Sequence, residues 1–135
     1  MTYSSEIWTT TRKMLKSIAV TQRSMERIMI GTTKRDKWTN RKVRQTTKTI
    51  DALQFCMKVK WNWAGHIARR QDGRWTKRLT EWTSRNGQKG RGKPARRWKD
   101  DLRDFFRTNI RMREAQDRRR WRNMLEAYIQ QWIDI

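Results

Sequence analysis

Apolar residues recur at intervals of three and four positions along much of the chain, which is the spacing of one face of a helix. The first such stretch predicts a helix that Thr10 or Thr11 caps and that ends near residue 30, before Gly31. Its apolar face is expected to hold Leu15, Ile18, Gln22, Met25 and Met29. The opposite face carries the cations Arg12, Lys13, Lys16, Arg23 and Arg27.

The middle of the chain predicts three further helices. Thr39 is expected to cap a short helix that ends near residue 45, and Thr49 or Asp51 starts a long one that runs to about residue 70. The long helix should bury Leu53, Cys56, Val59 or Lys60, Trp63 and Ile67. Asp72-Gly73 indicates a turn, after which a short helix is expected to carry Trp75, Leu79 and Trp82.

The periodicity is lost over residues 83–93, a stretch with three glycines and four basic residues that predicts a flexible loop. Pro94 suits the first turn of a following helix. The buried side of that helix is expected to hold Trp98, Leu102, Phe105 and Phe106. A last helix over residues 111–133 should bury Ala115, Trp121, Leu125, Tyr128 and Trp132.

These patterns predict an all-α fold of four or five helices. Leu, Ile, Val and Phe make up only 21 of the 135 residues, and the formal net charge is +21, so the core must be thin. Nine tryptophans counter the tendency to disorder, since indoles bury a large apolar area. The expected organisation is a helical segment over residues 1–82, a basic loop over 83–93 and a helical pair over 94–135.

The charge balance suggests the class of partner. Lys and Arg number 34 against 13 Asp and Glu, and a polyanion relieves the resulting self-repulsion. Nucleic acid, RNA or DNA, is therefore the first partner to consider, and an acidic membrane surface the second. The sequence has no apolar run long enough to span a bilayer and no apolar signal region at its start, so an intracellular location is expected, and the basic runs are compatible with the nucleus.

The strongest binding signal is a basic run that contains no acidic residue between positions 85 and 99. A glycine-rich backbone can follow the spacing of phosphates, and cationic side chains neutralise them. The residues expected to contact phosphate are Arg85, Lys89, Arg91, Lys93, Arg96 and Arg97. A solvated linker or a nuclear-targeting patch is the alternative interpretation. A second basic cluster consists of Arg118, Arg119, Arg120 and Arg122, which cannot all share one helical face.

Tryptophans can also stack on bases. Trp61 and Trp75 are flanked by basic residues and are the candidates for stacking. The spacing of the others favours core positions, namely for Trp63, Trp98, Trp121 and Trp132.

No catalytic or metal-binding constellation is recognisable. Asp100 and Asp101 lack a third carboxylate, and acidic residues at a helix start stabilise its N-terminal end. They are also within reach of Arg96 and Arg97. His66 is expected to be packed or capped and Cys56 to be a small buried hydrophobe; one His and one Cys cannot form an ordinary zinc site. No cofactor is expected.

The order of several short motifs resembles the C-terminal region of endonuclease–reverse transcriptases from non-LTR (LINE-type) retrotransposons, similar to those of insects and nematodes. The resemblance covers nearly the whole chain. The matching motifs begin with Thr2-Tyr3, Glu6-Ile7-Trp8-Thr9, Gln22-Arg23, Met25-Glu26-Arg27, Lys60-Trp61 and Trp63-Ala64-Gly65-His66-Ile67-Ala68-Arg69-Arg70. They continue with Asp72-Gly73-Arg74-Trp75, Gly92-Lys93-Pro94, Arg97-Trp98-Lys99-Asp100-Asp101-Leu102, Ala115-Gln116-Asp117-Arg118, Trp121, Glu126-Ala127-Tyr128 and Gln130-Gln131-Trp132.

The resemblance implies thumb-like helices and a basic tail that follow a polymerase domain. The Tyr/Phe-x-Asp-Asp hairpin of the polymerase is absent, so the family's activity does not transfer to this chain alone. The leading hypothesis is a fragment that binds nucleic acid through phosphates and has no catalytic site. The second is an interaction module that docks on the polymerase domain of the parent protein, and an independent enzyme is the third.

Overall fold

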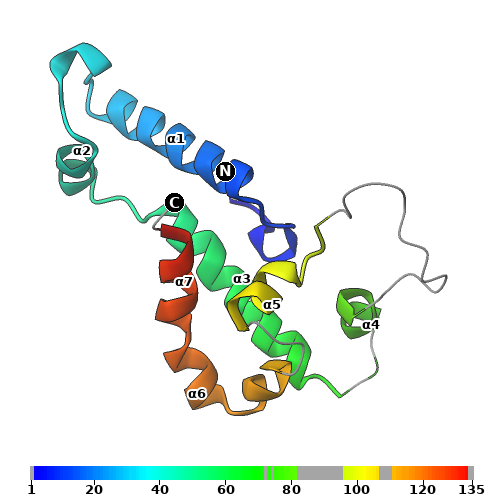
Figure 1. The fold of residues 1–135 in the computed structure, drawn as a ribbon. Helices are drawn as coiled ribbons and strands as arrows, with labels where there is room; N and C mark the ends of the chain where they lie inside the picture. Colours follow the sequence, from blue (N-terminus) through cyan, green and yellow to red (C-terminus); the bar gives the residue numbers. More distant parts are fainter. Residues whose placement is uncertain (1, 72, 74, 82–95, 107–110, 134–135) are drawn as a thin grey trace.

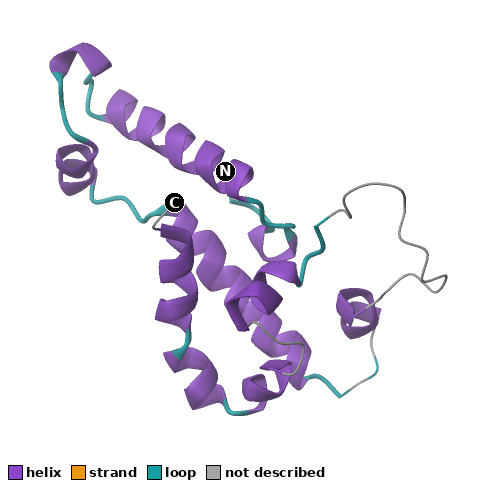
Figure 2. Cartoon of the chain, in the orientation of Figure 1, coloured by secondary structure: helices purple, strands orange, loops and turns teal. Residues whose placement is uncertain are grey.

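The computed structural model describes residues 2–71, 73, 75–81, 96–106 and 111–133. Within these residues every regular element is helical, which confirms the all-α prediction (Figure 2). The α-helices are α1 (Arg12–Met29), α2 (Asn40–Thr47), α3 (Ala52–Arg69), α4 (Trp75–Glu81), α5 (Asp100–Phe106), α6 (Arg118–Asn123) and α7 (Leu125–Ile133). Three 3₁₀ turns accompany them, namely η1 (Ser5–Ile7), η2 (Lys34–Asp36) and η3 (Arg111–Gln116).

The predicted caps begin the N-terminal helices. The Thr11 hydroxyl accepts the backbone N–H of Met14 at 3.3 Å, and the Thr39 hydroxyl accepts that of Lys42 at 3.2 Å. The Asp51 carboxylate accepts the amides at the start of α3. Each cap satisfies amides that have no partner within the helix, so these boundaries follow directly from local sequence.

Helix α3 is the central element of the fold. It contacts η1, α1, α7 and η3, and α5 lies beside it (Figure 1). The second half of α1 and helix α2 extend away from this group, and α4 follows the C-terminal end of α3, which it contacts. The buried cluster draws on segments before and after residues 82–95: Leu15, Cys56, Met57, Trp61, Ala64, Ala68, Leu102, Phe106, Ala115, Trp121, Tyr128, Ile129 and Trp132.

Helix α1 buries a different stripe from the one predicted. Met25 and Met29 were expected inside but are 42% and 64% exposed, because the second half of α1 extends away from α3. Gln22 is buried as predicted, and Glu26 is buried in place of Met25. These two polar side chains join α1 to the segment before α3.

Gln22 holds that segment by two hydrogen bonds. Its side-chain amide donates to the carbonyl oxygen of Ile50 at 2.9 Å and accepts the backbone N–H of Ala52 at 2.8 Å. We expect Gln22→Ala to lower the free energy of unfolding by about 1–3 kcal/mol, because the buried Ala52 amide loses its partner. Urea denaturation followed by circular dichroism measures this. Thr21→Ala, at an exposed position, should change it by less than about 0.5 kcal/mol, and an equal effect of the two changes would contradict the assignment.

The C-terminal part corrects two predicted helix boundaries. Helix α5 begins at Asp100 and not near Pro94, which lies outside the described residues; the Arg97 backbone N–H donates to the Asp100 carboxylate at 2.7 Å. The last helix, predicted to be continuous over residues 111–133, is divided into η3, α6 and α7. Asp117 causes the first break, because its carboxylate accepts the amides of Arg119 and Arg120 and so starts a new helix.

Candidate nucleic-acid interface

Most carboxylates among the described residues take part in ion pairs or helix caps within the chain. Ion pairs join Glu26 to Arg23, Asp51 to Arg23 and Arg44, Asp100 to Arg103, Asp101 to Lys60, Asp104 to Arg96 and Glu114 to Arg120. Asp36 and Asp117 accept backbone amides at helix starts. Since the chain has 21 more cations than anions, these contacts leave an excess of positive charge at the surface, and many of the arginines and lysines are exposed.

The predicted phosphate-contacting residues divide into two groups. Arg85, Lys89, Arg91 and Lys93 lie outside the described residues. Arg96 and Arg97 lie just before α5 and differ in what they contact. The Arg96 guanidinium pairs with Asp104 at 2.9 Å and lies over the Trp132 ring at 5.8 Å, so it is partly engaged within the fold. The Arg97 side chain is exposed, which suits contact with a polyanion.

The expectation that Arg96 or Arg97 pairs with the two aspartates is wrong for their side chains. The Asp101 carboxylate is buried and lies 2.8 Å from the Lys60 ammonium. The ammonium also donates to the Trp8 carbonyl at 2.8 Å and to the Thr10 hydroxyl at 3.0 Å. Two helices and the N-terminal segment thus meet at one buried ion pair.

Tyr128 completes this buried cluster, because its hydroxyl donates to the Asp101 carboxylate at 3.1 Å. Burial lowers the pKa of the Lys60 ammonium, and the negative charge of Asp101 opposes that shift. Burial, followed by the charge of Asp101, raises the pKa of the Tyr128 phenol well above its ordinary value, so the phenol remains a neutral donor. The geometry gives Asp101 a structural role and leaves it no exposed face.

Trp61, proposed above to stack on bases, is instead fully buried, which is a correction. Its ring stacks on Trp121 with centroids 4.0 Å apart and an angle of 15° between the planes. The Trp61 indole N–H donates to the Trp121 carbonyl at 2.9 Å, and the Trp121 indole N–H donates to the Trp61 carbonyl at 3.1 Å. The neighbouring basic residue Lys60 misled the prediction, because its ammonium is itself buried against Asp101 and does not mark an exposed face of the helix.

Gly65 allows this tryptophan pair to form. A Cβ atom at that position would lie 2.6 Å from the Trp121 Nε1 atom, which real contacts do not reach. The Trp-x-Trp-Ala-Gly motif of α3 therefore specifies core packing. Its other tryptophan, Trp63, was expected in the core but is only partly buried, with the Arg70 guanidinium 5.8 Å from its ring.

Trp75 remains accessible for stacking. Its side chain is 73% exposed, and the Arg78 guanidinium lies 5.6 Å from the ring centroid. An exposed indole beside a cation presents an apolar face and a positive charge to a nucleotide. The four arginines of the second basic cluster are also exposed on α6, although Arg120 pairs with Glu114 at 2.8 Å.

Cys56 and His66 are the remaining residues that could take part in chemistry, and they differ in burial. Cys56 is buried as predicted, and burial raises the pKa of its thiol. His66, expected to be packed or capped, is exposed on α3. Within the described part of the chain no three His, Cys, Asp or Glu side chains are grouped so that they could hold a metal ion.

No described helix is both long enough and apolar enough to cross a membrane.

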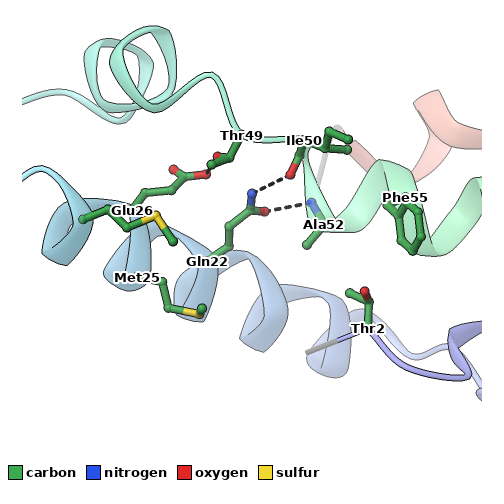
Figure 3. A pocket seen from close by; sticks show the side chains of 9 residues that line it. Thr2, Gln22, Met25, Glu26, Thr49, Ile50, Ala52 and Phe55 are labelled. Atoms are coloured by element: carbon green, nitrogen blue, oxygen red, sulfur yellow. Dashed lines mark hydrogen bonds between the residues drawn. The ribbon is translucent and has the colours of Figure 1, made fainter.

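An apolar hollow lies where α1 faces the start of α3 (Figure 3). Met25, Met29, Ile50 and Phe55 line it, and each of these side chains is between 42% and 76% exposed. The polar side chains of Gln22 and Glu26 also line the hollow. They form hydrogen bonds with Ile50, Ala52 and Thr49 in the segment that leads into α3. The hollow could not be predicted from the sequence, because the spacing of Met25 and Met29 favours core positions.

Comparison with known proteins yields one informative relative. An uncharacterized protein of Caenorhabditis elegans, described as transposon-derived, is 36% identical over 133 residues, which covers 90% of this chain and 48% of the relative. The chain thus spans about half the length of this curated relative. No protein-family model matches the chain, and no solved structure matches it significantly.

Proposed function

We propose that this chain is a nucleic-acid-binding segment derived from a transposon, and specifically from the thumb and tail region of a LINE-type reverse transcriptase. The similarity to a transposon-derived nematode protein supports the origin, and the motif order supports the region. In this proposal the chain contacts RNA or DNA along the phosphate backbone and carries no catalytic site of its own. A parent protein with polymerase and endonuclease domains would act in the nucleus.

The observation that carries the proposal is that most described acidic residues are engaged by contacts within the chain, which leaves the excess of cations exposed. Buried or capping contacts engage carboxylates such as Glu26, Asp51 and Asp101, while most of the arginines and lysines on α1, α2 and α6 remain exposed. Such a surface attracts the regularly spaced charges of a nucleic acid and releases its counterions. The residues proposed to contact phosphate are Arg85, Lys89, Arg91, Lys93, Arg96 and Arg97, and Trp75 is proposed to stack.

The first test compares a DNA duplex, an RNA strand and an RNA–DNA hybrid by fluorescence anisotropy at one salt concentration. A segment that holds a template–primer duplex should prefer the hybrid. Alanine at Arg91, Lys93, Arg96 and Arg97 should weaken binding to all three ligands by a similar factor, because phosphate contacts carry little base information. The alanine variant binding as tightly as the unaltered chain would contradict the assignment of these residues.

A second candidate function is docking on a polymerase domain of the parent protein. The exposed apolar hollow of Met25, Met29, Ile50 and Phe55 favours it. Exposed apolar surface rimmed by polar residues is typical of protein contacts. Under this proposal the chain should associate with itself when isolated, and Ile50→Ser with Phe55→Ser should suppress the association measured by light scattering. If the chain without substitutions stays monomeric in light scattering, that result would argue against docking.

A further inference from the structure

One face of α1 carries cations that form no ion pair with the described residues. Lys13, Lys16, Ser17, Val20 and Thr21 line a shallow surface on this helix. The last four follow Lys13 by three, four, seven and eight positions, so all five side chains lie on the same side of α1. Both lysines are exposed, and no ion pair joins either to a carboxylate among the described residues.

The cations nearer the end of α1 are bound within the fold. Arg23 pairs with Glu26 at 3.4 Å and reaches Asp51 at 3.8 Å. Arg27 donates to the Trp38 carbonyl and to the Asn40 side chain, both at 3.0 Å. The first half of α1 therefore differs from the second in that its charges point to solvent. This contrast does not follow from the even distribution of basic residues in the sequence.

The start of α1 is also fixed beside the residues that precede α5. The Trp98 indole N–H donates to the Glu6 carbonyl of η1 at 2.6 Å. The Lys60 ammonium holds the Trp8 carbonyl and the Thr10 hydroxyl on one side and Asp101 on the other. Figure 1 shows η1 between the start of α1 and α5. Arg97 and the first turns of α1 thus belong to one fixed scaffold.

We propose that Lys13, Lys16, Ser17 and Thr21 form a second phosphate-binding surface on α1, which extends the nucleic-acid interface from Arg97. This inference rests on the proposed function. Two ammonium groups and two hydroxyls on one helical face match the donors that commonly bind the phosphates of a nucleic-acid backbone. The hydroxyls add hydrogen bonds where the lysines supply charge. The residues predicted from the sequence to contact phosphate all lie nearer the C-terminus.

The test compares two variants with the same loss of charge in the full chain. Lys13→Gln with Lys16→Gln removes two charges from this face, and Lys34→Gln with Arg35→Gln removes two exposed charges from η2, at the far end of the α1–α2 extension. On a DNA duplex, the first variant should reduce the magnitude of the slope of log K against log salt by about 2. The second should reduce it by less than about 0.5.

Two further measurements distinguish a phosphate-binding surface from a diffuse charge effect. Ser17→Ala with Thr21→Ala should weaken binding about threefold or more without altering the salt slope, because it removes hydrogen bonds and not charge. In chemical acetylation of the unaltered chain, bound nucleic acid should protect Lys13 and Lys16 more strongly than Lys34. Circular dichroism should show that all variants retain the helical content of the unaltered chain.

Several results would overturn the inference. Equal changes of slope in the two charge variants would show that only net charge matters, with the proposed function intact. Unchanged nucleic-acid affinity of Lys13→Gln with Lys16→Gln, together with lost binding to phosphatidylserine vesicles, would assign the face to an acidic membrane. Failure of the unaltered chain to bind any nucleic acid at low salt would overturn both this inference and the proposed function.

Discussion

Replacing Asp101 with alanine should lower the free energy of unfolding by about 3–5 kcal/mol, because it leaves the buried Lys60 ammonium without its counter-ion. The Tyr128 hydroxyl loses its acceptor at the same time. The net stability of a small domain is only about 5–15 kcal/mol, so the variant should lose a large fraction of its stability and unfold at a clearly lower urea concentration. Urea denaturation followed by circular dichroism measures the loss.

A neighbouring carboxylate provides the matched control. Asp104 lies on the same helix and pairs with Arg96, but its side chain is 56% exposed, so Asp104→Ala should cost no more than about 1 kcal/mol. Adding Lys60→Met to Asp101→Ala should recover part of the lost stability, because the stranded charge is then removed. An Asp101→Ala variant as stable as Asp104→Ala would show that the buried ion pair does not hold the fold together.

Gly65→Ala should also destabilise the chain, by about 1–3 kcal/mol. In most exposed helix positions this change stabilises, since alanine has the higher helix propensity. Here the new methyl group would lie 2.6 Å from Trp121 Nε1. The indole must move, which breaks its hydrogen bond to the Trp61 carbonyl and disturbs the stacked pair. The sign of the effect therefore tests the packing of α3 against α6.

His66→Ala is the matched control for this change. His66 follows Gly65 in sequence but is exposed, so its replacement should alter the free energy of unfolding by less than about 0.5 kcal/mol. The near-ultraviolet circular dichroism of the stacked indoles should weaken in Gly65→Ala and persist in His66→Ala. A stabilised Gly65→Ala variant would contradict the close approach of Trp121.

Local sequence was enough to predict several helix starts and the fold class. Thr11, Thr39 and Asp51 act as caps because their side chains bond amides only two or three residues away. Gly31 ends α1 with a positive φ of 65°, a conformation that glycine adopts without strain. The periodicity of α3 likewise predicted burial of Cys56 and Ile67. These features depend on neighbours in the chain and not on the arrangement of distant helices.

Long-range contacts explain most of the differences. The sequence left the choice between Val59 and Lys60 open, and Lys60 is buried because Asp101, 41 residues later, supplies its counter-charge. Trp61 is buried because Trp121 and Tyr128 surround it. Met25 is exposed because the second half of α1 projects beyond α3. Periodicity identifies a helical face but does not tell which partner meets it.

Contacts within the fold also decide which cations of the candidate interface are available to a ligand. Composition and net charge pointed to nucleic acid, yet they did not separate engaged cations from available ones. The structure makes that separation for Arg23 and Arg96, which form ion pairs, and for Lys13, Lys16 and Arg97, whose side chains are exposed. Motif residues such as Trp61, Gly65 and Asp101 maintain the scaffold, and the described residues proposed to bind, such as Lys13, Lys16 and Arg97, are exposed on it.

The most direct test of the central claim is the salt dependence of binding between the unaltered chain and a fluorescent DNA duplex. We expect log K to fall linearly with log salt with a slope of roughly −4 to −7, as expected for about five to seven phosphate contacts. Absence of binding at low salt by protein that circular dichroism shows to be helical would contradict nucleic-acid binding, and docking on a partner protein would then be the better explanation of this fold.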